Sequence, residues 1–100
     1  MLKKDLIWLC LLHLLAAKDL YGYEILNQIH DSFPDTQESA IYAELRGMCR
    51  NGYTEQYQGQ TSGGPTRKYY RLTESGKRKY IDLLGEWRHL RDTLTGMGIE

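Results

Sequence analysis

The chain has 100 residues, and its 13 basic and 13 acidic side chains leave no formal net charge at pH 7. This length predicts one small domain that needs additional surface to bury enough apolar area, and the neutral total by itself favours neither a nucleic acid nor a membrane as partner. Cys10 and Cys49 lack the spacing of zinc ligands or of a disulfide framework, and no catalytic triad, phosphate loop or carboxylate pair is recognisable, so we expect neither an enzyme nor a metal or cofactor site.

The beginning of the chain imitates a signal peptide, because two lysines precede an apolar run that ends in small residues. Asp5 and His13 interrupt this run, and the run is too short to span a bilayer. We therefore predict a helix over residues 5–17, capped by Asp5, in a cytoplasmic protein with reduced cysteines. This helix is apolar nearly all round, so it must be covered on several sides.

A second helix is predicted over residues 23–33 by apolar residues at helical spacing. Pro34 ends this helix, because proline cannot donate a hydrogen bond to the preceding turn and restricts the residue before it. The apolar positions are Ile25, Leu26, Ile29 and Phe33.

A third helix follows almost at once. Asp35 and Glu38 have the spacing of a capping box, although Thr36 or Gln37 would serve equally well as the cap. Residues 51–52 are Asn-Gly, which supplies the left-handed turn with which helices commonly end. One face carries Ile41, Leu45 and Met48, and the other carries Ala40, Tyr42, Ala43, Arg46 and Arg50.

Beyond this helix the pattern changes to the alternation of β-strands. Residues 53–58 and 67–72 are rich in tyrosine and threonine, and we expect them to pair as a hairpin around the flexible loop 59–66. A neutral protein that concentrates positive charge in one segment presents one face to an anionic partner, the alternative being a solvated charge run. From residue 60 to residue 80 the chain has one acidic residue, Glu74, and six basic ones, Arg67, Lys68, Arg71, Lys77, Arg78 and Lys79.

The last predicted helix runs from a cap at Thr73 towards Met97. Its apolar residues recur at spacings of three and four, the heptad pattern of one helix that lies along another. Such a seam packs either against the protein's own core or against a second copy; we favour the second copy, because the seam is long, terminal and follows a complete unit. The seam consists of Tyr80, Leu83, Trp87, Leu90, Leu94 and Met97.

Three helices, a basic hairpin and a long helix follow one another in the order of a winged helix-turn-helix, an α+β and mainly α fold. Residues 1–72 are then a DNA-binding domain, and residues 73–100 are a dimerisation helix. In this fold the outer face of the third helix enters the major groove of double-stranded DNA, and the hairpin lies against the backbone or the minor groove. The candidate DNA contacts are Ala40, Tyr42, Arg46, Gly64, Arg67, Lys68 and Arg71.

Two of these interpretations have structural alternatives. Tyr42 is either a contact to the groove or a tyrosine that is half buried between the second and third helices. Of Tyr69 and Tyr70, we expect one to pack under the hairpin, so we do not assign a function to both.

Three segments resemble the PadR family of bacterial transcriptional regulators: LYGYEILNQI, SAIYAELRGMCRNGY and GGPTRKYYRLTESGKRKY. The third is the most specific, because its glycines precede the run Arg67-Lys68-Tyr69-Tyr70 and then Leu72-Thr73-Glu74 and Gly76. The resemblance covers residues 6–94. It implies a homodimer on a palindromic operator, usually a repressor that a small molecule or a stress signal releases, in the smaller subfamily with one C-terminal helix.

The resemblance also implies a pocket between the subunits. In some regulators of the smaller kind, an aromatic residue at the position of Trp87 lines a pocket for flat hydrophobic compounds. A filled interface is the alternative, because a tryptophan at a seam is more often packing than pocket. The candidate interface residues are Trp8, Leu12, Tyr80, Leu83, Trp87, Leu90 and Leu94, and the candidate ligand contacts are Trp8, Leu9, Leu12, Leu83 and Trp87.

A function of a different class also remains open. A winged helix that does not bind an operator can act as a protein-interaction module, with the basic hairpin docked on an acidic partner. Steep loss of duplex binding with rising salt would separate a DNA-binding regulator from such a module.

Overall fold

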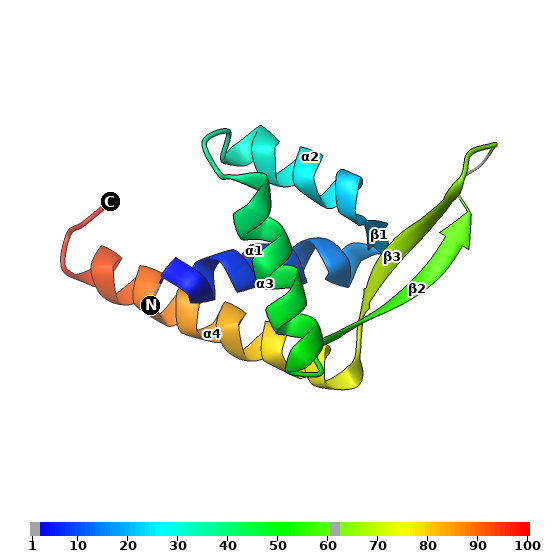
Figure 1. The fold of residues 1–100 in the computed structure, drawn as a ribbon. Helices are drawn as coiled ribbons and strands as arrows, with labels where there is room; N and C mark the ends of the chain where they lie inside the picture. The colour runs from blue at the N-terminus through cyan, green and yellow to red at the C-terminus, as the bar shows by residue number, and fades with distance from the viewer. Residues whose placement is uncertain (1–2, 61–62) are drawn as a thin grey trace.

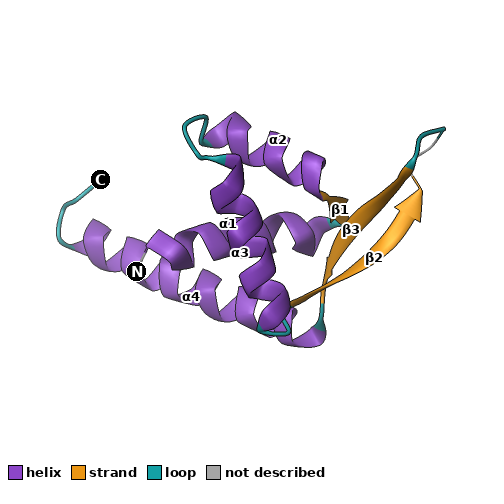
Figure 2. Ribbon diagram, viewed as in Figure 1, coloured by secondary structure: helices purple, strands orange, loops and turns teal. Residues whose placement is uncertain are grey.

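The computed structural model describes residues 3–60 and 63–100, which form helices packed around a small antiparallel sheet (Figures 1 and 2). The order of the elements confirms the predicted winged helix-turn-helix with a long C-terminal helix. In chain order they are α1 (Lys3–Ala17), β1 (Leu20–Tyr21), α2 (Gly22–Ser32), α3 (Glu38–Arg50), β2 (Thr54–Gln60), β3 (Thr66–Leu72) and α4 (Glu74–Gly96).

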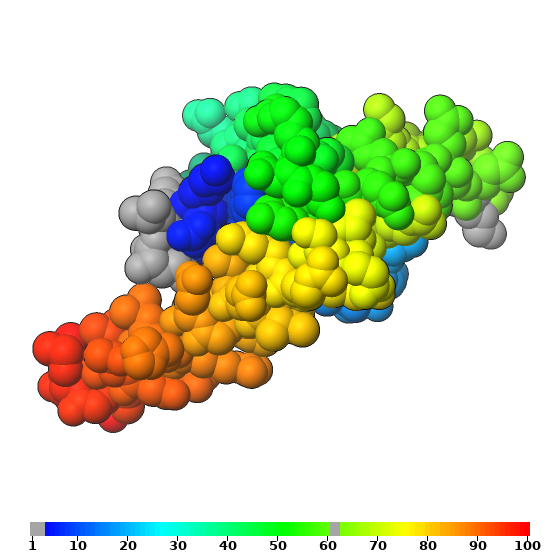
Figure 3. Space-filling view, turned by 90° about the horizontal axis from the view of Figure 1, so that it is seen from below, coloured from blue at the N-terminus to red at the C-terminus, as the bar shows by residue number. Residues whose placement is uncertain are grey.

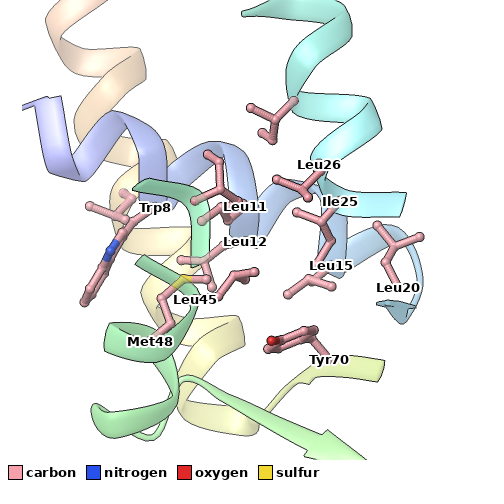
Figure 4. Close-up of a cluster of buried hydrophobic side chains, with 13 residues drawn as sticks. Trp8, Leu11, Leu12, Leu15, Leu20, Ile25, Leu26, Leu45, Met48 and Tyr70 are labelled. Carbon is pink, nitrogen blue, oxygen red and sulfur yellow. The ribbon is translucent and has the colours of Figure 1, made fainter. Parts of the chain in front are cut away.

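The helix α1 lies at the centre of the core, where it contacts α2, α3, α4 and β3 (Figure 4). Leu11 and Leu12 are completely buried, whereas Leu6 is 41% exposed. The other elements cover α1 on several sides, as its apolar sequence requires, but leave part of its surface open. The remaining core residues are Trp8, Leu15, Leu20, Ile25, Leu26, Ile29, Ile41, Leu45, Met48, Tyr70 and Leu83.

The ends of α2 and α3 follow the predicted signals closely. Among the candidate caps of α3, Gln37 is the cap residue; its backbone is extended, and its side chain makes no capping hydrogen bond. Gly52, just after α3, has a φ of 76°, the left-handed conformation that glycine adopts without a steric penalty. The short connection over residues 33–37 joins α2 to α3 as the turn of a helix-turn-helix, and Gly52 follows the end of its second helix.

The sheet has the strand order β1-β3-β2, with antiparallel pairing throughout. The strand β1, just before α2, is not among the predicted elements: Leu20 pairs with Tyr70, and Tyr21 pairs with Tyr69. The strands of the hairpin are also longer than predicted, because β2 continues through Gly59 to Gln60. The expected loop is correspondingly shorter, and its residues 61–62 lie outside the described residues.

Thr73 caps α4 as predicted and also ties it to the end of α3. Its Oγ1 accepts a hydrogen bond from the backbone N–H of Gly76 at 3.0 Å and donates one to the carbonyl oxygen of Gly52 at 2.6 Å. A Cβ atom at Gly76 would overlap the carbonyl oxygen of Tyr53. The start of α4 therefore lies directly against the turn that ends α3, and only glycine permits this contact.

The predicted seam of α4 is divided between two environments. Leu83 is 1% exposed in the core of the single chain, so the first part of the seam packs against the chain's own core. Beyond Trp87 the helix projects from the body of the molecule, as the orange and red end in Figure 3 shows. Leu90 is 36% exposed there and Met97 is 71% exposed. Only this distal part of the seam has apolar surface left for a second copy.

Candidate nucleic-acid interface

The outer side of α3 carries the candidate major-groove residues. Ala40 and Arg46 are exposed, whereas Tyr42 is half-buried. The ring of Tyr42 lies over the start of α2, because a Cβ atom at Gly22 would be 3.1 Å from its hydroxyl oxygen. Tyr42 is therefore half-buried between α2 and α3, which was the alternative to a free contact with the groove.

The hairpin β2–β3, here called the wing, has two distinct faces. Side chains alternate between the faces along each strand, and directly paired residues point to the same side. Tyr70, which is 7% exposed, marks the inner face towards the core. The pairing of β2 with β3 then assigns Gln56, Gln58, Gln60, Thr66, Lys68 and Tyr70 to the inner face, and Glu55, Tyr57, Gly59, Arg67, Tyr69 and Arg71 to the outer face. The predicted basic contacts of the wing are thus split between its two sides.

The outer face holds an arginine that is already paired. Arg71 Nε donates a hydrogen bond to Glu55 Oε1 at 2.8 Å, and its guanidinium lies 4.9 Å from the centre of the Tyr57 ring. The hydrogen bond to Glu55 raises the pKa of Arg71. Because its charge is balanced within the wing, Arg71 stabilises the hairpin and offers little net attraction to a phosphate.

Tyrosines fill the rest of the outer face. The rings of Tyr57 and Tyr69 stack at 5.6 Å, and the ring of Tyr21 meets that of Tyr69 edge-on at 5.5 Å. Tyr57 donates a hydrogen bond to Asp19 Oδ2 at 2.6 Å, and this bond raises the pKa of Tyr57. The guanidinium of Arg67 lies 5.5 Å from the Tyr21 ring. These contacts tie the wing to β1 and to the end of α1.

The inner face combines a buried anchor with unpaired polar side chains. Burial raises the pKa of Tyr70, while a hydrogen bond with Gln56 and the positive charge of Arg46 oppose that rise. The helix α3 contacts β2, so the exposed Arg46 lies on an element next to the wing. Lys68 and Gln58 are exposed, and neither side chain makes a hydrogen bond or an ion pair within the described part of the chain.

The tip of the wing is narrow and carries glycine. Gly63 has a φ of 70°, which requires the left-handed conformation, and Gly64 is exposed beside it. A tip without bulky side chains at these positions lets the backbone approach a surface closely. Gly64, the predicted DNA contact, is exposed, and the positive φ belongs to its neighbour Gly63.

The residues predicted for the dimer interface and ligand pocket separate into two groups. Trp8, Leu12 and Leu83 are at most 5% exposed in the single chain. Tyr80 and Leu9 are half-buried, and Tyr80 Oη lies 2.6 Å from His13 Nδ1, which joins α4 to α1.

The second group lies on the projecting part of α4, where Trp87, Leu90 and Leu94 retain accessible surface. The guanidinium of Arg91 covers the Trp87 ring at 5.0 Å from its centre. The exposed apolar residues outside the seam pattern include Leu6 on α1 and Ile81 on α4, which are 41% and 65% exposed. Of the predicted interface residues, Trp87, Leu90 and Leu94 therefore have accessible surface for a partner or ligand, whereas Trp8, Leu12 and Leu83 are buried in the single chain.

Two further properties bear on the type of site. Among residues 3–60 and 63–100, no cluster of three or more histidine, cysteine, aspartate or glutamate side chains has a geometry that would hold a metal ion. Within the same described residues, no helix has both the length and the apolar character needed to cross a membrane.

Comparison with known proteins agrees with this geometry. The model of the transcriptional regulator PadR-like family matches residues 11–82. An uncharacterized protein of Lysinibacillus sphaericus is 35% identical over 88 residues, which cover 84% of this chain and 80% of that protein. The crystal structure of a PadR family transcription regulator from Clostridium difficile R20291 is 32% identical, covers 91% of this chain and 96% of its own, and superposes with a TM-score of 0.81.

One similar structure contains nucleic acid. Bacillus subtilis PadR in complex with operator DNA is 27% identical, with a TM-score of 0.67, and the match covers 79% of this chain and 46% of that one. The family model spans more than half of the chain, and the observed fold is the winged helix of these regulators. The chain therefore belongs to the PadR-like family of transcriptional regulators.

Proposed function

We propose that this chain binds a palindromic operator as a homodimer and represses transcription in the cytoplasm until a small planar hydrophobic effector releases it. The observation that carries the DNA-binding part is that two exposed positive charges lie on neighbouring elements: Arg46 on α3, which contacts β2, and Lys68 on the inner face of the wing that β2 forms with β3. Lys68 forms no ion pair within the described residues. That a relative with a similar fold is found in complex with operator DNA supports the proposed operator binding.

The proposed contacts follow from this arrangement. Ala40 and Arg46 meet base edges or phosphates from α3, and Tyr42, whose hydroxyl group lies over Gly22, positions α3 on α2 and meets the groove only with the part of its ring that stays accessible. Lys68 and the backbone at Gly64 meet phosphates from the wing, with Arg67 reaching them from the outer side of the strand. Arg71 supports the wing through Glu55 and is the weakest of the predicted contacts.

The proposed dimer forms through the distal part of α4, with residues 1–72 as the DNA-binding unit and residues 73–100 as the dimerisation helix. Trp87, Leu90 and Leu94 supply the seam, and Leu6 and Leu9 of α1 extend it. Burial of these side chains by a second copy removes apolar surface from water, which stabilises association by about 25 cal/mol per Å². A symmetric dimer would then present two copies of α3 to half-sites about one helical turn of DNA apart.

The proposed effector site is also at this interface. Trp87 is the one predicted ligand contact that keeps accessible surface on the projecting helix, while Leu12 and Leu83 belong to the core. A planar hydrophobic dye should quench tryptophan emission in the native dimer, and Trp87→Ala should abolish the quenching while the dimer persists in sedimentation. Quenching that survives in Trp87→Ala would place the dye elsewhere.

The function is tested by titrating the protein against duplex DNA from upstream of its own gene at several salt concentrations. Phosphate contacts from both subunits predict that the logarithm of the affinity falls steeply and linearly with the logarithm of the salt concentration. A footprint with two symmetric halves is the expected companion result. Binding that is absent, or independent of salt, would refute operator binding and leave the protein-interaction module as the function.

A further inference from the structure

The strand β2 carries glutamine at every second position, namely Gln56, Gln58 and Gln60. The strand period of two places all three amides on the inner face of the wing, on the same side as Lys68 and Tyr70. Because the strand order is β1-β3-β2, β2 is the edge of the sheet, and β3 is its one neighbour in the described sheet. The three glutamine side chains are exposed, and α3 contacts the same strand.

The three amides do not have the same environment. Gln56 is engaged by the hydroxyl group of the buried Tyr70. The side-chain amides of Gln58 and Gln60 are exposed and form no hydrogen bond within the described residues. Gln58 is paired directly with Lys68, so one amide and one ammonium group stand side by side on this face. Gln56 thus has a partner within the protein, whereas the amide groups of Gln58 and Gln60 have unused hydrogen-bond donors and acceptors.

We propose that Gln58, with Gln60 beyond it, contacts base edges of A·T pairs in the minor groove that flanks each half-site, while Lys68 binds the adjacent phosphate. This inference rests on the proposed operator binding and assigns a base-reading role that the basic residues of the wing do not have. A neutral amide adds no long-range attraction to phosphates, but it can donate to the adenine N3 and thymine O2 acceptors. Glutamine is among the side chains with which proteins read that groove.

The spacing of the row fits such a contact. Residues two apart on a strand are separated by about 6.6 Å, and two base-pair steps of B-DNA rise by about 6.8 Å. A strand that follows the groove can therefore place Gln58 and Gln60 at base pairs two steps apart. The exocyclic amino group of guanine protrudes into the minor groove, so G·C pairs at these positions would obstruct the same approach.

The test uses the full-length dimer and duplexes in which the flanking A·T pairs of the footprinted operator are replaced by G·C or by inosine·cytosine. Inosine lacks the guanine amino group, so its pair with cytosine presents an A·T-like minor groove and a G·C-like major groove. We expect the unaltered protein to bind the A·T and inosine operators equally and the G·C operator about tenfold more weakly. The double variant Gln58→Ala/Gln60→Ala should bind all three duplexes with nearly the same affinity, and Gln58→Ala alone should lose part of the preference.

Two variants serve as controls. Gln28→Ala removes an exposed amide from α2, away from the wing, and should keep the tenfold preference. Lys68→Ala should weaken binding to all three duplexes by a similar factor. Thermal unfolding and sedimentation confirm that each variant is a folded dimer.

The outcomes separate this inference from the function on which it rests. An unaltered preference in Gln58→Ala, or inosine duplexes that bind as weakly as G·C duplexes, would overturn minor-groove reading while operator binding stands. Failure of the unaltered protein to bind any duplex would remove operator binding and this inference together.

Discussion

At the scale of single residues, the positive charges of the wing have unequal surroundings. Arg71 is balanced by Glu55 on the outer face, whereas Lys68 stands unpaired on the inner face beside Gln58. An ion pair between exposed side chains contributes only about 0.2–1 kcal/mol to stability. It also neutralises the positive charge of the arginine, which would otherwise attract a phosphate. The face of the wing on which a basic residue lies therefore determines its role more than its place in the sequence does.

This contrast gives a prediction for two variants of equal charge. Lys68→Ala should weaken every duplex by a similar factor and reduce the salt slope of the dimer by about 2, because one phosphate contact is lost from each subunit. Arg71→Ala should leave the slope nearly unchanged and instead lower the stability of the wing slightly. Binding titrations at several salt concentrations measure both slopes; equal losses in the two variants would contradict the assignment of the faces.

The buried Tyr70 makes stability depend on pH in the alkaline range. Burial raises its pKa in the folded protein above the value of about 10 that tyrosine has when unfolded. The folded state therefore holds this proton more tightly, and the free energy of unfolding should fall as the pH rises above about 10. Tyr70→Phe keeps the ring and cannot ionise, so denaturant unfolding between pH 8 and 11 should show a smaller alkaline loss than in the unaltered protein. An identical loss in the two proteins would assign the effect to other groups.

At the scale of elements, the joint between α3 and α4 links the winged helix to the long C-terminal helix, the proposed dimerisation helix. Thr73 is bonded both to Gly76 within α4 and to Gly52 after α3, and the backbone of Gly76 lies against Tyr53. A rigid joint fixes the direction in which α4 leaves the domain. In a dimer, that direction would set the distance between the two copies of α3.

Two glycines of α4 provide a matched test of this joint. At Gly76 an added Cβ meets the carbonyl oxygen of Tyr53, whereas at Gly85 nothing lies within 4 Å. Gly85→Ala should stabilise the protein by up to about 1 kcal/mol, since alanine favours an exposed helix interior over glycine. Gly76→Ala should destabilise it by a larger amount, because the backbone of one segment must move. Thermal unfolding gives both values, and a stabilised Gly76→Ala variant would show that the contact is not tight.

The elements differ in how well the sequence predicts them. The helices and the hairpin follow from local signals, such as the heptad spacing of α4 and the cap at Thr73. The two-residue strand β1 does not, because Leu20 and Tyr21 are extended only through pairing with Tyr70 and Tyr69, some fifty residues later in the chain. The division of Arg67, Lys68 and Arg71 between two faces is implicit in strand alternation, but which face is the inner one depends on the burial of Tyr70. The glutamine row of β2 was visible in the sequence but acquired meaning only from the pairing of Gln58 with Lys68.

At the scale of the whole molecule, the single chain is elongated, with principal extents of 52 × 30 × 22 Å, because the end of α4 projects beyond the core. A helix end that carries exposed leucine and methionine gains little from the rest of its own chain. Self-association buries that surface and doubles the number of DNA contacts without adding residues. The neutral total charge is compatible with this arrangement, because only the surface of α3 and the wing needs to face a polyanion.

The final prediction concerns the distal part of α4, where neighbouring residues separate the dimer from the fold. Leu90→Glu places a charge in the proposed seam at a site outside the core of the single chain, so the monomer should remain folded with an almost unchanged helix content. His89→Glu adds the same carboxylate one residue earlier, on a side of the helix that points away from the seam, and should leave the dimer intact. Sedimentation at micromolar concentration should show a monomer for Leu90→Glu and a dimer for His89→Glu. Operator affinity should fall by orders of magnitude only in the former, because two half-sites are then bound independently. A dimeric Leu90→Glu variant with unaltered operator affinity would show that the two chains meet through another surface.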